Sequence, residues 1–305
     1  MKNAIILSIA LAVSACSSAT GQLATAPQPE PVIGDTTPAP DAMRWLYGSG
    51  EAAAISIQSW RMLADYAVAK ARQRRVPQSV PMGVDGAVAQ PSCSTGAGIK
   101  PLAVVLDMDE TVILNTGYEY WLARGNAYSS STWAAWERSG AALARPVPGA
   151  VTAIRRLREA GIAPVFNTNR QHSAEGAIAS LAAAGIGEAV HGETLFLRGD
   201  DGVGSGKDGR RALIAQRYCV IAMAGDNLGD FADVFNAEGA GVQARRQLAA
   251  GGDYAQLWGN GWFVLPNPVY GDSISGSIGE VFPEDQRWNA DTAPSGAPAI
   301  MNEGN

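Results

Sequence analysis

The sequence has little of what several classes of catalyst require. Among 305 residues there are only two histidines, His172 and His191, too few for the histidine-rich transition-metal centres of many metalloenzymes. Charged residues make up 17% of the chain, and the formal net charge of −6 argues against a nucleic-acid partner held by a basic surface. The hydrophobic share of 47% is enough for one sizeable core.

Cysteine is also scarce, with three residues in all. Neither Cys93 nor Cys219 is followed at a suitable distance by the arginine that a cysteine nucleophile needs to act on phosphate esters, which excludes that chemistry. Cys219 lies in the apolar run from Tyr218 to Ala224, and this favours a buried free thiol. A disulfide between Cys93 and Cys219 is the alternative if the chain is exported.

The first residues have the pattern of an export signal. A weakly basic head precedes an apolar run, Ala4–Val13, that is too short to span a bilayer and has the length of a signal-peptide core. Ser14 and Ala15 then precede Cys16, and this arrangement resembles a lipoprotein signal, in which the cysteine is lipidated and becomes the new N-terminus. Plain secretion with cleavage near the same place is the alternative.

The composition of the two ends predicts the domain organisation. We expect residues 1–15 to be a signal peptide and residues 16–40, which are rich in Ala, Thr, Pro and Gln, to be a tether between a lipid anchor and the folded body. Ser17 resembles the signal for sorting to the outer membrane, on its periplasmic or surface face. One domain is expected over residues 41–282, and a loose polar tail over residues 283–305.

Short apolar runs alternate with helical segments in the middle of the chain. The runs lack the polar alternation of half-exposed strands, so they predict strands buried on both faces of a parallel sheet. We expect a three-layer, Rossmann-like α/β fold with its site at the carboxyl ends of the strands. Residues 115–145 interrupt the alternation and have the position of a small helical cap, and residues 76–100 are expected to be a loop. The expected strands are Leu102–Leu106, Ala163–Thr168, Thr194–Leu197, Val220–Ala224 and Trp262–Leu265, and the expected helices are Asp41–Arg75, Gly149–Ala160, Ala174–Ala184, Gly209–Arg217 and Leu228–Phe235.

Acidic pairs follow two of the expected strands. Asp107 and Asp109 come directly after Leu102–Leu106, so both side chains can face one site at the edge of the sheet. Another strand ends at Asp226, with Asp230 on the opening turn of the next helix. A single acid in such a position often only caps a helix. Two acid pairs favour a cation among them, because clustered carboxylates repel one another and Mg²⁺ prefers oxygen ligands that it shares with a phosphate.

Other polar residues complete the candidate site. Thr168 and Asn169, at the end of a further expected strand, offer a hydroxyl and an amide that suit phosphate oxygens, and Arg170 adds a guanidinium. Lys207 lies in a glycine-rich loop and can neutralise charge on a phosphate, although an isolated lysine in such a loop is more often simply exposed.

The order of these pieces resembles the haloacid dehalogenase (HAD) superfamily, in which D-x-D, a strand-end Thr, a Lys and G-D-x-x-x-D follow one another. More narrowly, the segments Asp107–Asn115 and Gly225–Phe231 resemble the paired motifs of the class C bacterial acid phosphatases, the lipoprotein acid phosphatase and 5'-nucleotidase family. Trp45, Ser49 and Glu51 and the segment Leu265–Gly271 also resemble that family, so the resemblance covers roughly residues 41–279. A departure follows at Asp272 and Ser273, where the family shows Trp-Glu in the leaving-group pocket.

The resemblance implies an acid phosphatase with a HAD-like domain, four essential aspartates and Mg²⁺ as its cofactor. Asp107 would attack phosphorus, and Asp109 would protonate the leaving alcohol and then activate water. The implied metal ligands are Asp107, the main-chain carbonyl of Asp109, and Asp226, with Asp230 ordering their shell, and the implied phosphate-binding residues are Thr168 and Lys207.

The family often acts on nucleoside monophosphates, which implies an aromatic pocket that stacks the base. Tyr118, Trp121, Tyr254 and Tyr270 are the candidates for this pocket, and packing of the cap against the core is the alternative role for their rings. Two other functions are a phosphotransferase of the same fold and a non-catalytic, ligand-binding surface lipoprotein. The intact aspartates and Lys207 argue against the second of these.

Overall fold

The structure, a computed structural model, describes residues 36–73 and 76–289. The chain divides into two compact units, residues 1–38 and 39–305, and all helices and strands of the described residues belong to the second unit. The predicted export signal and Cys16 lie outside the described residues. Within the ranges that are described, no helix combines the length and the apolar character needed to cross a membrane.

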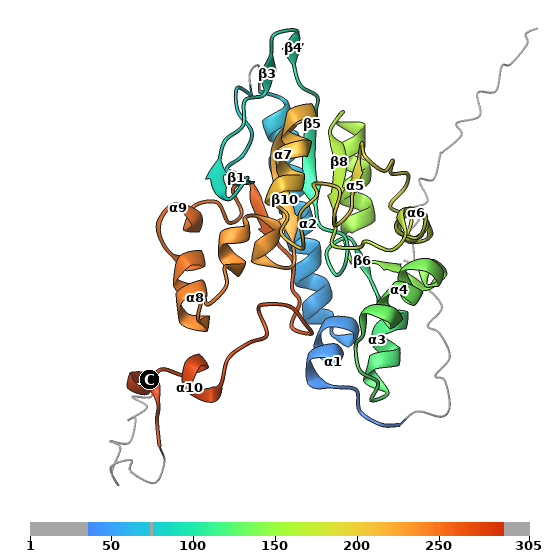
Figure 1. The fold of residues 1–305 in the computed structure, drawn as a ribbon, viewed down its shortest axis with the longest axis vertical. Helices are drawn as coiled ribbons and strands as arrows, with labels where there is room; N and C mark the ends of the chain where they lie inside the picture. The colour runs from blue at the N-terminus through green and yellow to red at the C-terminus, as the bar shows by residue number, and fades with distance from the viewer. Residues whose placement is uncertain (1–35, 74–75, 290–305) are drawn as a thin grey trace, which may run out of the picture. The chain divides into compact units, whose positions relative to one another are not determined.

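A five-stranded parallel sheet forms the centre of the second unit (Figure 1). The strand order is β11-β10-β5-β8-β9, and each neighbouring pair runs parallel. The strands are β5 (Leu102–Leu106), β8 (Ala163–Asn167), β9 (Leu195–Phe196), β10 (Cys219–Gly225) and β11 (Trp262–Val264). All five expected strands are present within two residues of their predicted bounds, which confirms the α/β class.

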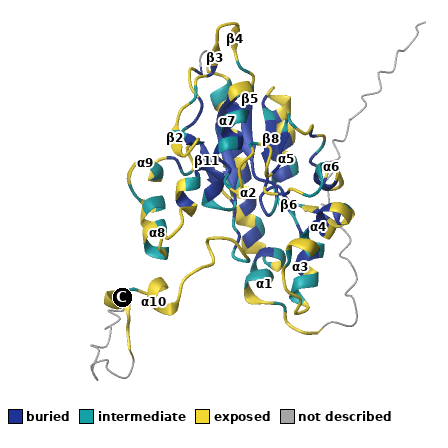
Figure 2. Cartoon of the chain, in the orientation of Figure 1, coloured by how far each residue is buried: buried dark blue, intermediate teal, exposed yellow. Residues whose placement is uncertain are grey.

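The sheet is buried on both faces, as the unbroken apolar runs predict (Figure 2). In β5, Val104 and Leu106 belong to one core cluster, whereas Ala103 and Val105 belong to the other. The first cluster includes residues of α2 (Gly50–Ala71), α5 (Ala150–Glu159) and α6 (Ala174–Ala183), and the second includes residues of α7 (Asp208–Arg217). The side chains of a strand alternate between the two faces, so the fold has three layers.

Three parts of the expected secondary structure need correction. The expected helix Asp41–Arg75 is two helices, α1 (Asp41–Gly48) and α2, because Ser49 accepts a hydrogen bond from Ala52 N at 3.1 Å and caps a new helix. The expected helix Leu228–Phe235 is two short 3₁₀ turns, η2 (Leu228–Asp230) and η3 (Asp233–Asn236). The expected loop 76–100 contains two hairpins, made of β1 (Met82–Val84), β2 (Ala87–Ala89), β3 (Ser94–Thr95) and β4 (Gly98–Ile99).

The segment expected to form a cap is helical. It contains α3 (Thr116–Ala123), α4 (Ser130–Ser139) and the short η1 (Ala141–Leu143), and it is closed by the antiparallel pair β6 (Ile113–Leu114) and β7 (Arg145–Pro146). Four further elements follow the last expected helix and are absent from the sequence analysis: α8 (Val242–Ala250), α9 (Gly252–Ala255), α10 (Ile278–Val281) and η4 (Glu284–Gln286). None of these four contains a buried residue.

Cys93 and Cys219 form a disulfide, and both are fully buried. The apolar run around Cys219 predicts a free thiol, and this prediction is wrong because strand pairing brings Cys93 and Cys219 together. Cys219 is in register with Leu102 at the start of β5, and Lys100 N donates to Cys93 O at 2.9 Å. The bond joins residues 126 positions apart, and closing so long a loop in the unfolded chain stabilises a protein by about 4–5 kcal/mol.

Candidate active site

The register of three strands brings the predicted site residues to one edge of the sheet. Leu106, the last residue of β5, is paired with Ala224 of β10 on one side and with Phe166 of β8 on the other. The residues that follow these three positions therefore emerge side by side at the carboxyl ends of the strands. Asp107 and Thr168 are among them, and both are buried.

Three carboxylates meet at this edge. One oxygen each from Asp107, Asp226 and Asp230 lies within 4.8 Å of the others. Asp230 reaches this position because Gly225 has no side chain, since a Cβ at Gly225 would overlap the Asp230 carboxylate. The two acid-bearing strands, β5 and β10, are neighbours in the sheet.

Lys207 is buried among these carboxylates instead of being exposed. Its Nζ donates to Asp107 Oδ1 and, at 2.7 Å, to Asp230 Oδ1. Burial by itself lowers the pKa of Lys207, but the attraction of the two carboxylates outweighs it and raises the pKa overall. Lys207 therefore remains positively charged at physiological pH.

One cation is not enough for three clustered carboxylates, two of them buried and the third, Asp226, half-buried. Burial raises the pKa of Asp107 well above its usual value, and Asp230 and Asp226 raise it further although Lys207 opposes them. Burial and the neighbouring Asp230 raise the pKa of Asp226 to about 7. Asp226 also accepts hydrogen bonds from Thr111 Oγ1 at 3.0 Å and from Asn267 Nδ2 at 2.7 Å. The cluster thus carries more negative charge than the protein compensates.

The donor set fits a hard divalent cation. All three side chains offer oxygen atoms, which Mg²⁺ prefers, and they are close enough to share one ion. The raised pKa values of Asp107 and Asp226 have the same physical cause, because carboxylates crowded in a buried site favour protons until a cation replaces them. The Asp109 side chain is not part of this group.

Asp109 is held instead by Arg170. Arg170 Nε and Nη2 donate to Asp109 Oδ1 at 3.0 and 2.8 Å, and Asn115 Nδ2 donates to the same oxygen at 2.9 Å. Burial raises the pKa of Asp109, but the charge and the hydrogen bonds of Arg170 and Asn115 outweigh it, so the pKa is lowered overall. The guanidinium of Arg170 also suits phosphate oxygens by its place in the sequence, whereas in the structure it is buried and turned to a carboxylate.

The Arg170 network extends into the cap. Arg170 Nη2 also donates to Asn115 Oδ1 at 2.9 Å, and Trp136 Nε1 of α4 donates to the same oxygen at 2.8 Å. The guanidinium lies 5.7 Å from the ring centroid of Trp133, within the range of a cation–π contact. The cap therefore contacts the carboxylate that the resemblance makes the general acid.

Glu110 is a further buried carboxyl beside the site, and the sequence analysis did not single it out. Its φ of +56° is left-handed, a conformation that costs about 1–2 kcal/mol for a residue with a side chain. Tyr47 of α1 donates to Glu110 Oε1 at 3.2 Å, and Tyr270 donates to Glu110 Oε2. Burial and the nearby Asp109 raise the pKa of Glu110 to about 8. Asn115 N, which donates to Oε1 at 2.9 Å, lowers it in part.

Thr168 and Asn169 are joined to the rest of the site by their backbone and side-chain oxygens. Thr168 Oγ1 accepts a hydrogen bond from Arg170 N at 3.1 Å and lies 3.4 Å from Asp109 Oδ2. Asn169 is exposed, and its Oδ1 accepts a hydrogen bond from Arg210 Nη2 at 2.6 Å. The Arg210 guanidinium also donates to the Thr168 carbonyl.

The four predicted aromatic residues lie in three different places. Tyr118 is buried in the cap, 5.7 Å from Trp121 and 5.1 Å from Trp133 between ring centroids. Tyr254 is partly buried and packs against the second core cluster, with its ring 4.9 Å from Phe235. Tyr270 is 39% exposed and reaches the site through its hydrogen bond to Glu110. Tyr254 is therefore a packing residue, whereas the side chain of Tyr270 donates a hydrogen bond to Glu110, next to Asp109.

A parallel α/β sheet with clustered carboxylates and a buried lysine at its carboxyl edge is the architecture of the HAD superfamily. The family described as HAD superfamily, subfamily IIIB (Acid phosphatase) matches residues 56–273. The chain belongs to this family, so it is an acid phosphatase, a hydrolase that acts on small phosphomonoesters.

Solved structures of class C acid phosphatases share this fold. The class C acid phosphatase from Bacillus anthracis with tungstate bound is 24% identical, with a TM-score of 0.58, over 76% of this chain and 84% of that chain. A second structure of the class C acid phosphatase from the same organism is 25% identical, with a TM-score of 0.57 and the same shares covered. Both likenesses agree with the resemblance seen in the two aspartate motifs.

Proposed function

We propose that this acid phosphatase requires Mg²⁺ and hydrolyses nucleoside monophosphates through an aspartyl-phosphate on Asp107. The observation that carries the proposal is the meeting of Asp107, Asp226 and Asp230 within 4.8 Å, with Lys207 inserted between two of them. This arrangement supplies a nucleophile, a cation site and a fixed positive charge within one small volume. Those are the requirements of phosphoryl transfer.

In the first step, an Asp107 carboxylate oxygen forms a bond to phosphorus and the bond from phosphorus to the ester oxygen breaks. The leaving alcohol takes a proton from Asp109. In the second step, Asp109 accepts a proton from water, and the water oxygen attacks the phosphorus of the aspartyl-phosphate. The bond to the Asp107 oxygen breaks, which releases inorganic phosphate and restores the carboxylate.

Asp107, Asp226 and the Asp109 carbonyl would hold the proposed cation, and Asp230 would order the site. When bound, the cation would offset the charge of the carboxylates and of the phosphate oxygens. Lys207 and Thr168 bind the non-bridging oxygens of the phosphate, and Lys207 also keeps Asp107 oriented through its ion pair. The Bacillus anthracis structure holds bound tungstate, and because tungstate is a tetrahedral oxyanion like phosphate, it is a suitable probe of the phosphate site proposed here.

Tyr270 supports the choice of nucleotides as substrates. Its ring is partly exposed, and its hydroxyl is fixed by Glu110, one residue after Asp109. A ring held in this way can stack on a base without losing further conformational freedom, and such stacking contributes about 1–3 kcal/mol per base. Trp121, which is half-buried in the cap, is the second candidate for this contact.

We also propose that the enzyme is exported and anchored in the outer membrane by a lipid on Cys16. The pattern around Cys16 is the basis of this proposal, and the disulfide Cys93–Cys219 supports it, because such bonds persist in oxidising compartments. Metabolic labelling with a fatty-acid analogue tests the anchor. Wild type is expected to take up the label and Cys16→Ala to lose it, and an equal label on both would contradict the proposal.

Phosphate release from nucleoside monophosphates and from p-nitrophenyl phosphate tests the catalytic proposal. The assay compares wild type with Asp107→Asn, each with Mg²⁺ and with EDTA. We expect turnover that needs the metal, disappears in the variant and is faster with nucleotides. Wild-type turnover that persists in EDTA would reject the metal, and an active Asp107→Asn would reject the nucleophile.

A further inference from the structure

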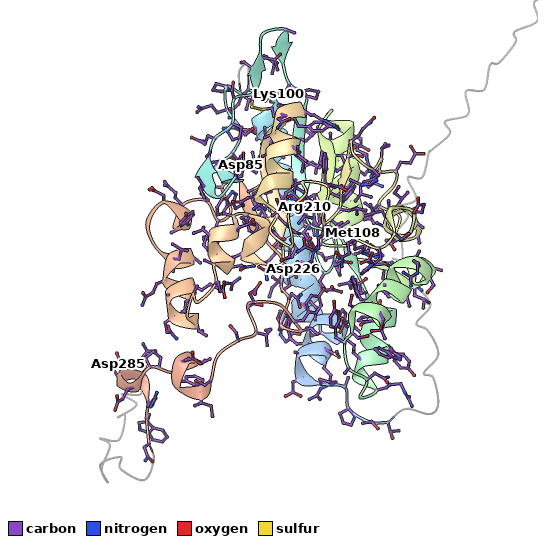
Figure 3. The ribbon with its side chains drawn as sticks, in the orientation of Figure 1. Asp85, Lys100, Met108, Arg210, Asp226 and Asp285 are labelled. Atoms are coloured by element: carbon purple, nitrogen blue, oxygen red, sulfur yellow. A yellow bond between two sulfur atoms is a disulfide. The ribbon has the colours of Figure 1, made fainter. Side chains whose placement is uncertain are left out.

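Three buried cations lie at the start of α7 and reach three different loops of the site. Lys207 directly precedes the helix and contacts Asp107 and Asp230. Arg210 and Arg211 follow within one turn, and both are completely buried. Figure 3 shows Arg210 in the central part of the ribbon, as it does Asp226. Two fully buried arginines in adjacent positions are costly unless their donors are satisfied, so their partners indicate their purpose.

Arg210 joins the end of β8 to the loop that precedes α7. Its Nη1 donates to the Thr168 carbonyl, and its Nη2 donates to Asn169 Oδ1 at 2.6 Å and to the Gly206 carbonyl at 2.9 Å. Thr168 and Lys207 are the two residues proposed to bind phosphate oxygens, and Gly206 directly precedes Lys207. Arg210 therefore fixes the distance between the two sides of the phosphate site without lying in it.

Arg211 points to the opposite side and joins α7 to the loop after β10. Its Nη1 donates to the carbonyls of Gly229 and Asp230 at 3.0 and 2.8 Å. Its Nε donates to the Gly83 carbonyl of β1 at 2.8 Å. Asp230 is one of the three clustered carboxylates, so Arg211 fixes the backbone from which the cation site is built.

The helix start is itself held in place by two aspartates. Asp233 Oδ1 accepts from Lys207 N at 2.8 Å and from Arg211 Nη2 at 3.1 Å. Asp208 accepts from Arg211 Nη2 and from Asp233 N. A Cβ on Gly206 would come within 2.5 Å of Asp233 Oδ2, so a glycine is required there. These hydrogen bonds hold the start of α7, from which both arginines extend, in one position.

We propose that Arg210 and Arg211 are positioning residues with separate roles in this enzyme. Arg210 sets the spacing of Thr168 and Lys207 and so controls affinity for the phosphate group. Arg211 sets the position of the Asp230 loop and so controls affinity for the divalent cation. The proposal rests on the proposed function, which assigns phosphate binding to the first pair and metal binding to the Asp230 cluster.

Two binding constants measured on the full chain separate these roles. Calorimetry gives the dissociation constant of Mg²⁺ without substrate, and inhibition by inorganic phosphate at saturating Mg²⁺ gives the second constant. The variants are Arg210→Lys and Arg211→Lys, which keep the charge but lose the planar fork of donors. Arg217→Lys is the matched control, because Arg217 is an exposed arginine on the last turn of the same helix.

We expect Arg210→Lys to raise the inhibition constant of phosphate by about tenfold to a hundredfold, as misplacement of binding groups does, with little change in Mg²⁺ affinity. Arg211→Lys is expected to weaken Mg²⁺ binding by about tenfold or more, as loss of a group that orients metal ligands does, with little change in phosphate inhibition. Arg217→Lys should change neither constant. Equal changes of both constants in both variants, or no change in either, would overturn the proposal.

Two milder variants keep the proposal testable if an arginine variant does not fold. Asn169→Ala removes one partner of Arg210, and Asp233→Asn removes the charge that faces Arg211. Each is expected to change the same constant as the corresponding arginine variant by a smaller factor, and the opposite assignment would overturn the proposal. Wild type that binds neither Mg²⁺ nor phosphate would instead reject the proposed function, so the two failures are distinguishable.

Discussion

The active site has two halves that differ in how their charge is balanced. The metal half consists of Asp107, Asp226, Asp230 and Lys207, where one buried cation faces three carboxylates. The acid half consists of Asp109 and Arg170, where a buried guanidinium faces one carboxylate. Burial and like charges raise the pKa values of Asp107 and Asp226, whereas Arg170 overcomes burial and lowers the pKa of Asp109.

The difference shows which half needs an ion from solution. The acid half is complete within the protein, because its carboxylate is held by two side chains that the fold supplies. The metal half is incomplete, since the protein leaves its carboxylates prone to bind protons. A divalent cation would supply the missing charge, and the comparison therefore predicts that ions and pH affect the two halves differently.

The largest expected effect comes from the metal half. Asp226→Asn removes a predicted ligand, and we expect loss of turnover by on the order of 10²-fold or more at moderate Mg²⁺, with partial recovery at high Mg²⁺. Steady-state kinetics across a Mg²⁺ titration provides the measurement. A variant with unchanged Mg²⁺ dependence would mean that Asp226 does not bind the cofactor.

The acid half is tested by Arg170→Gln. Without the guanidinium, Asp109 loses its orientation, so we expect turnover to fall on the order of 10²-fold for alkyl phosphates, and the pKa of Asp109 also rises. The loss should be smaller for p-nitrophenyl phosphate, whose phenolate leaves with less need of a proton. The fall of activity toward high pH should also move to higher pH, because Asp109 then stays protonated longer. Equal losses for both leaving groups would assign Arg170 a purely structural role.

Stability should depend on pH through carboxyls with raised pKa values. Burial raises the pKa of Glu110 from 4.5 to about 8, so its contribution to stability is complete below pH 4.5 and is lost as the pH rises through about 8. Glu119 and Asp226, each raised to about 7, act in the same direction. The melting temperature of the metal-free protein should therefore fall across this window. Glu110→Gln should flatten the fall, and an unchanged slope would show that Glu110 is already ionised in the folded protein.

The smallest expected effect concerns the leaving group. Tyr270→Phe keeps the ring but loses the bond to Glu110, and Tyr270→Ala loses both. We expect Tyr270→Ala to raise KM for nucleoside monophosphates by about tenfold, while KM for p-nitrophenyl phosphate changes little. Tyr270→Phe should lie between it and wild type. An equal rise for both kinds of substrate would count against base stacking.

The sheet and the carboxylate cluster could be predicted because both leave strong local signals. The strands are apolar on both faces. Acids placed directly after two such parallel strands must lie at the carboxyl edge of the sheet. The elements missed in the C-terminal part have the opposite character. No residue of α8 is buried, so no apolar stripe marks it in the sequence.

Contacts between distant segments could not be predicted in the same way. Arg170 followed a strand-end threonine and resembled a phosphate ligand, and only the packing of Asn115 and the cap turns it to Asp109. In the sequence, Arg210 and Arg211 look like ordinary residues of a polar helix. Their roles become visible only in the structure, where they contact the loops after β8 and β10. The disulfide likewise depends on the pairing of β5 with β10.

The central claim is that the metal half lacks a cation that the protein itself does not supply. Calorimetric titration tests this claim most directly. Mg²⁺ is titrated into the chelator-treated enzyme near pH 6, in two buffers of different ionisation enthalpy. The account predicts one ion bound per chain, with protons released from the carboxylates as it binds. Asp226→Asn should bind more weakly and release fewer protons. Folded wild-type protein that binds no Mg²⁺, or binds it with no release of protons, would contradict the account.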